Sequence, residues 1–129
     1  MEIPVGTAFT AKTVVDETNI ASAVGSGLVD VFATPMMIAL LELAASECLK
    51  PFLEPGQASV GAHVNVSHTG ATPVGMTVSA TAAIAHVDRR RVEFVVEMSD
   101  EKGEIGSGTH TRYIIDVARF MEKTAAKQS

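Results

Sequence analysis

The chain has 129 residues, and its 10 lysines and arginines against 15 aspartates and glutamates give a formal net charge of −5. This length predicts a single domain over residues 1–129 and excludes two domains of ordinary size. The negative charge argues against a nucleic-acid partner, because the only basic run is Arg89 to Arg91. Charged residues make up 19% of the chain, which is low for a monomer and predicts a surface buried between subunits.

Cysteine content and hydropathy bear on the compartment. The one cysteine, Cys48, has no second cysteine in the chain to pair with, so nothing indicates an oxidising environment. No apolar run reaches the roughly 18 residues of a membrane-spanning helix, and the first residues lack the apolar core of a signal peptide. We therefore expect a cytoplasmic protein that does not associate with membranes.

The first third of the chain predicts one strand and one helix. Gly6–Val15 alternates loosely and favours a strand, whereas the small residues of Asp16–Leu28 favour a loop or a loosely helical cover. Thr34 followed by Pro35 is typical of an N-cap and a first helical residue, and the helix should stop before Pro51. Its apolar side chains point in nearly every direction, so we expect a buried helix.

Four further strands are predicted after this helix, with short turns between them. Short turns join antiparallel neighbours, so these strands should form a meander. Val117–Lys127 is expected to form a short terminal helix. The order of elements predicts an α+β fold, in which an antiparallel sheet wraps around one central helix. The four strands are Ala58–His68, Met76–His86, Arg91–Met98 and Glu104–Asp116.

Two residues of the predicted helix are candidates for chemistry. Glu42 is the only charged side chain from Thr34 to Ser46, and a carboxylate among apolar residues needs a partner or a shifted pKa. The alternative is that Glu42 lies on a solvated strip with Ser46. Thr34 lies about 80° from Glu42 around the helix. It is either a plain N-cap or part of a helix start that holds a developing oxyanion.

The predicted strands add a histidine and an arginine. His68 ends the second strand and is either a boundary residue or a functional imidazole. Arg112 shares a strand phase with His110, where a charge must be paired or exposed. A metal site of His63 and His68 is not expected, because their phases oppose and no third ligand completes it. Four apolar residues share the phase of His68, namely Val60, Ala62, Val64 and Val66.

Three segments between Val31 and Arg112 carry a family resemblance, namely VFATPMMIALLELA, PFLEPGQASVGAHVNVSHTGATPVGMTV and EIGSGTHTR. Their order and spacing resemble the hotdog-fold thioesterases, in the branch that contains fluoroacetyl-CoA thioesterase. The resemblance implies that Thr34, Glu42 and His68 are the catalytic residues.

The same resemblance implies further properties of the site and the assembly. The backbone amide of Gly61 would receive the thioester oxygen, and Arg112 would be the family's substrate-binding arginine. The hotdog fold implies a homodimer, or a dimer of dimers, with active sites at the subunit interface.

The expected function is hydrolysis of a short-chain acyl-CoA thioester to a carboxylate and free CoA, without a metal or cofactor. Glu42 would act either as the nucleophile or as the base that activates water. Two alternatives remain open at this point. The same fold could serve as a non-catalytic acyl-CoA-binding module, or it could act as a hydratase or dehydratase.

Overall fold

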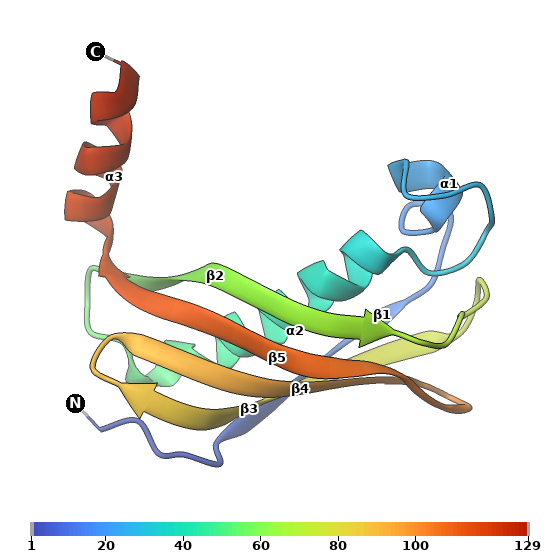
Figure 1. The fold of residues 1–129 in the computed structure, drawn as a ribbon, viewed down its shortest axis with the longest axis horizontal. Helices are drawn as coiled ribbons and strands as arrows, with labels where there is room; N and C mark the ends of the chain where they lie inside the picture. Colours follow the sequence, from blue (N-terminus) through green and yellow to red (C-terminus); the bar gives the residue numbers. More distant parts are fainter. Residues whose placement is uncertain (1, 129) are drawn as a thin grey trace.

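The computed structural model describes residues 2–128 and contains a five-stranded antiparallel sheet curled around helix α2 (Figure 1). The predicted α+β fold is confirmed, and each predicted strand lies within two residues of its observed bounds. The strands are β1 (Ala8–Val14), β2 (Gln57–His68), β3 (Thr77–Asp88), β4 (Arg91–Asp100) and β5 (Gly103–Asp116). The helices are α1 (Ala21–Val24), α2 (Thr34–Leu49), η1 (Lys50–Phe52), α3 (Val117–Ala125) and η2 (Ala126–Gln128).

The strand order is β1-β3-β4-β5-β2, with every neighbouring pair antiparallel. Strands β3, β4 and β5 form a meander, but the prediction that β2 belongs to it is wrong: the segment after β2 does not turn it back onto β3, and β2 pairs with β5 at the far edge of the sheet. Strands β1 and β2 are therefore the two edges. An edge strand presents unpaired backbone groups along its free side, and those of β2 are open to another chain.

Helix α2 begins one residue earlier than its sequence predicts. The carbonyl of Ala33 accepts the first hydrogen bonds, from the N–H groups of Met36 at 3.0 Å and Met37 at 2.9 Å. Ala33 is therefore the N-cap and Thr34 is the first helical residue, so the prediction that Thr34 caps the helix is wrong. The hydroxyl of Thr34 is left free of the helix backbone.

Helix α2 packs on the sheet but is not covered on every side. Its composition predicts a fully buried helix, and this prediction is wrong for one side of it. Met37, Leu41 and Leu49 have no exposed surface and contribute to the core between the helix and the sheet. Leu43 lies on the opposite side of the helix and is 50% exposed. An apolar strip of α2 thus remains uncovered in the single chain.

Strand β2 contains a β-bulge that changes its side-chain phase. Gly61 lies opposite Arg112 and His63 lies opposite Thr111, so Ala62 is an extra residue without a partner on β5. Because residues that face each other across a ladder share a side of the sheet, the bulge shifts every later residue of β2 to the other phase.

Because of the bulge, the prediction that His68 shares a side of the sheet with Val60 is wrong. Val64 and Val66 share the side of His68, as predicted, whereas Val60 precedes the bulge and lies on the other side of the sheet with Tyr113. Gly61 and His68 consequently both face α2. An unbroken strand would have placed these two residues on opposite sides.

Candidate active site

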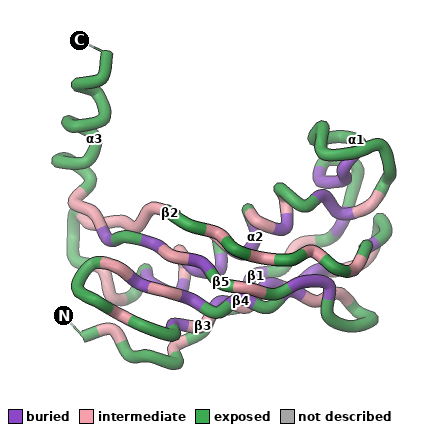
Figure 2. Tube along the Cα trace, viewed as in Figure 1, coloured by how far each residue is buried: buried purple, intermediate pink, exposed green. Residues whose placement is uncertain are grey.

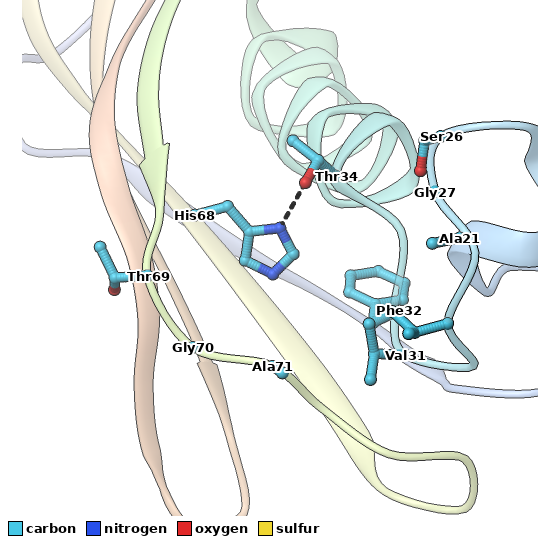
Figure 3. Close-up of a pocket in the computed structure, with 11 residues that line it drawn as sticks. Ala21, Ser26, Gly27, Val31, Phe32, Thr34, His68, Thr69, Gly70 and Ala71 are labelled. Carbon is cyan, nitrogen blue, oxygen red and sulfur yellow. Dashed lines mark hydrogen bonds between the residues drawn. The ribbon is translucent and has the colours of Figure 1, made fainter.

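Thr34 and His68, here called the Thr34 pair, meet where the start of α2 approaches the end of β2 (Figure 3). The Oγ1 atom of Thr34 and the Nδ1 atom of His68 are 2.7 Å apart and share a hydrogen bond. The Nε2 atom of His68 is buried and has no hydrogen-bond partner within residues 2–128. Since an unpaired buried polar atom is costly, its retention is typical of a functional group.

An open pocket of about 380 Å³ lies beside the Thr34 pair. Its volume falls in the range of small-molecule sites. Val31 and Phe32 line it just before α2, Ala71 lines it after β2, and residues around α1 complete its rim (Figure 3). Ser26 and Thr69 add hydroxyl groups to the lining, so the pocket combines apolar walls with several hydroxyls and one imidazole.

Glu42, Gly61 and Arg112 form a second group, here called the Arg112 cluster. The Nη1 atom of Arg112 is 3.7 Å from Oε2 of Glu42, and the arginine is 6% exposed whereas the Glu42 side chain is 42% exposed. Arg112 also donates from Nε to Oγ of Ser59 and from Nη2 to the carbonyl of Ser59, both at 2.9 Å. The guanidinium is therefore held in place, and it holds the Glu42 carboxylate beside β2.

Gly61 lets the Glu42 carboxylate lie directly against the backbone of β2. A Cβ atom at position 61 would collide with Oε2 of Glu42 and would lie 3.2 Å from Cε1 of His110. The φ angle of Gly61 is not positive, so any residue suits the backbone there. Glycine is needed for the close approach of the carboxylate and not for an unusual conformation.

We expect Gly61→Ala to displace the carboxylate and to lower kcat by about tenfold or more, since small misplacements of reacting groups are costly. The free energy of unfolding should change by less than about 1 kcal/mol, because the far end of the Glu42 side chain can move. Steady-state kinetics and urea unfolding of the same preparation measure both effects. Unchanged kinetics would show that the carboxylate has no role at this position.

His110 supports the Arg112 cluster from β5. Its Nε2 atom is 3.2 Å from Nη1 of Arg112, a donor, so Nδ1 carries the proton and donates to the carbonyl of His63 at 2.8 Å. The ring is fully buried and stacks on Phe94 with a centroid distance of 6.2 Å. Burial lowers the pKa of His110, and the adjacent Arg112 charge acts in the same direction. The shared phase of His110 and Arg112 was the one signal of this contact in the sequence.

The lowered pKa of His110 predicts a pH-dependent stability. Below its ordinary pKa of 6.5 the unfolded chain binds a proton that the folded chain does not, so stability falls as the pH drops towards the folded pKa. One proton gives a slope of at most about 1.4 kcal/mol per pH unit. We expect this pH dependence of the free energy of unfolding, measured by urea unfolding between pH 5 and 8, to be absent in His110→Gln. It should remain in the control His86→Gln, whose histidine is exposed.

The structure assembles each group within the chain but leaves the two groups apart. Gly106 lies opposite His68 and Arg112 lies opposite Gly61, so the groups are separated along β5 by six residues, about 20 Å of strand. Along α2 their helical members are eight residues apart, which is about 12 Å of axis. The Thr34 pair and the Arg112 cluster are therefore separate within a single chain, and the eight-residue spacing of Thr34 and Glu42 in the sequence already predicts this separation along the helix.

The remaining features of the described chain concern metals and membranes. Residues 2–128 contain no cluster of three or more histidine, cysteine, aspartate or glutamate side chains arranged to bind a metal ion. None of the helices described combines the length and the apolar character needed to cross a bilayer.

Comparison with known proteins relates this geometry to a family. Residues 15–118 match the family described as fluoroacetyl-CoA-specific thioesterase. The fluoroacetyl-CoA thioesterase of Streptantibioticus cattleyicolor is 44% identical over 98 residues, which cover 76% of this chain and 70% of that protein.

Solved structures agree with the sequence match. A structure of the fluoroacetyl-CoA thioesterase FlK superposes with a TM-score of 0.93 at 37% identity and covers 98% of both chains. A Thermus thermophilus member of the thioesterase superfamily gives a TM-score of 0.91 at 29% identity and covers 98% of this chain and 94% of that one. The chain therefore belongs to the fluoroacetyl-CoA-specific thioesterase family and is a thioester hydrolase with the hotdog fold.

Proposed function

We propose that this protein hydrolyses short-chain acyl-CoA thioesters as a homodimer, in which each active site combines the Thr34 pair of one chain with the Arg112 cluster of the other. The observation that carries the proposal is the hydrogen-bonded Thr34 pair beside a pocket, with His68 Nε2 left without a partner in the described chain. The separation of the Arg112 cluster supports a contribution from a second chain.

The free edge of β2 supports a specific way of pairing the chains. If two β2 strands pair antiparallel across a two-fold axis, the Gln57 end of each lies beside the His68 end of the other. With the two-fold axis between Val64 and Asn65, Gly61 of one strand lies opposite His68 of its partner. The same pairing satisfies the backbone groups of both edges and accounts for the low charged fraction of the chain.

The proposed chemistry divides the work between the Thr34 pair and the Arg112 cluster. If Nδ1–H of His68 donates to Oγ1 of Thr34, the lone pair of Nε2 is free to accept a proton. Glu42 either attacks the thioester carbonyl or accepts a proton from the attacking water. The backbone amide of Gly61 stabilises the oxyanion, a contribution worth about 10² to 10³ in rate for a single donor. The C–S bond then breaks, and the thiolate leaves as free CoA after taking up a proton. If Glu42 is the nucleophile, water then hydrolyses the mixed anhydride on Glu42 and releases the carboxylate.

The pocket of about 380 Å³, with Val29, Val31 and Phe32 among its lining residues, favours a small acyl group. Fluoroacetyl-CoA, the substrate named for the relatives, is the first to test, together with acetyl-CoA and a series of longer acyl chains. A thiol-release assay over this series measures kcat/KM for each substrate. We expect the short members to be hydrolysed fastest, and a preference for long chains would contradict the proposal.

Subunit complementation tests the shared site. Glu42→Gln and His68→Ala are each expected to inactivate the homodimer, but a mixed dimer contains one site in which both residues are intact. A re-associated equimolar mixture should therefore recover about one quarter of the wild-type activity, because half of the dimers are mixed and each has one complete site of two. No recovery in verified mixed dimers would show that each site belongs to one chain.

The proposal also covers the assembly and the compartment. Light scattering should give about 27 kDa, or about 54 kDa for a dimer of dimers, as multiples of the 13.5 kDa chain. Cys48 is a buried free thiol, which suits the reducing conditions of the cytoplasm.

A further inference from the structure

Helix α3 has an apolar face that the described chain covers only in part. At about 100° per residue, Val117, Phe120 and Met121 fall on one side, while Arg119 and Lys123 fall on the other. None of the α3 residues is buried, and Val117, Phe120 and Met121 are all among the exposed large apolar residues. The helix projects away from the sheet and is solvent-exposed along its length (Figure 2).

A second exposed apolar patch lies around α1, at the rim of the pocket. We call it the α1 patch, and it consists of Val24, Leu28 and Val29, of which Leu28 is 98% exposed. Val29 also lines the pocket beside the Thr34 pair. The pocket is therefore bordered by Val29, an apolar side chain that is 61% exposed in the single chain.

The charges of the two surfaces are opposite. No lysine or arginine occurs between Lys12 and Lys50, and Asp30 directly follows the α1 patch in the sequence. Helix α3 and the residues after it carry Arg119, Lys123 and Lys127 against the single acidic residue Glu122. Opposite charges around two apolar surfaces favour their contact and its orientation.

The positions of α3 and α1 relative to β2 match a two-fold assembly. Both helices project beyond the β2 edge on the same side, α3 at one end of the strand and α1 at the other (Figure 1). The N–H of Val117 donates to the carbonyl of Gly56, which fixes the start of α3 at the Gln57 end of β2. The pocket lies at the His68 end. A two-fold axis through the middle of β2 brings the α3 of one chain to the α1 patch of the other.

We propose that α3 docks its apolar face on the α1 patch of a second copy of this chain and forms the outer wall of that copy's acyl pocket. The inference rests on the proposed function, because the pairing of the β2 edges brings the two surfaces together. Each subunit thus contributes the Arg112 cluster and also a cover to its partner's site. Phe120 and Met121 lie over the pocket rim next to Val29.

Disulfide trapping tests the contact directly. The L28C/M121C protein should form an inter-chain disulfide under mild oxidant and run at about 27 kDa, twice the 13.5 kDa chain, on a non-reducing gel. Within one chain α3, which contains Met121, and α1, which lies shortly before Leu28, are at opposite ends of the molecule (Figure 1). The native Cys48 does not interfere, because it is buried and burial raises the pKa of its thiol. The matched control is L28C/E122C, whose second cysteine lies on the polar face of α3.

Kinetics tests whether the contact forms part of the site. The F120D/M121D protein should remain a dimer, since the β2 edge is untouched, while KM for acyl-CoA rises about tenfold or more through the loss of an apolar pocket wall. The control E122A should keep the wild-type KM.

The outcomes separate the two proposals. If the wild type is a dimer that passes the complementation test, but L28C/M121C does not cross-link and F120D/M121D keeps its KM, the docking of α3 is overturned and the shared site stands. If the wild type is monomeric or shows no complementation, both proposals fail. Cross-linking of L28C/M121C in preference to its control, together with the raised KM, establishes the α3 contact.

Discussion

Glu42→Gln is expected to fold normally and to lose about 10² or more in kcat, because the amide can neither attack the thioester carbonyl nor accept a proton from water. The side chain keeps its size and remains beside Arg112, whose other hydrogen bonds go to Ser59. The free energy of unfolding should therefore fall by no more than about 1–2 kcal/mol. Thiol-release kinetics and urea unfolding measure the two quantities.

The matched control is Glu47→Gln on the same helix, where the carboxylate is 3.8 Å from Lys50 in a solvent-exposed pair. Such pairs contribute little, so this variant should keep wild-type kinetics and stability. A Glu42→Gln protein that is folded and as active as this control would exclude a chemical role for the Glu42 carboxylate.

His68→Ala is expected to lower kcat by about 10² to 10⁴, the range that a positioned acid or base supplies. Its effect on stability should be small, because His68 is only partly buried, Nε2 has no partner in the described chain, and the released Thr34 hydroxyl is exposed to water. Thiol-release kinetics and urea unfolding of the same preparation measure the two effects.

His63→Ala provides the comparison for this variant. His63 is exposed on the same strand, and its contact with His110 uses the backbone carbonyl, which alanine retains. This variant should keep its activity. If His68→Ala instead lost several kcal/mol of stability with full activity per folded molecule, the imidazole would have a structural role.

Local sequence signals predict most of the helices and strands of this fold. Pro35 and Pro51 bound a long stretch of helix-forming residues, and this alone locates α2 to within two residues. Turn residues likewise separate strands whose alternation is clear, as in β4, where Val92, Phe94 and Val96 are buried in turn. These features depend on neighbours in the chain, and composition and spacing record them directly.

The geometry of the site could be predicted less well from the sequence. Small and apolar residues follow one another around Ala62, so no change in their pattern marks the bulge that brings Gly61 to the side of His68. The cap of α2 was also assigned one residue late, because the preference of threonine for caps does not register that Ala33 closes the first turn. The placement of Arg112 opposite Gly61 depends on the pairing of β2 with β5, and short motifs do not encode strand order.

The bulge in β2 makes the number of residues in this strand a functional quantity. Ala62 is exposed and has no partner on β5, so its side chain can be exchanged with little consequence. Its removal would instead reverse the parity of every position after it and turn His68 away from Thr34. The presence of a residue at position 62 is therefore essential, although the identity of its side chain is not. The number of residues between Gly61 and His68 has to be conserved for His68 to face Thr34.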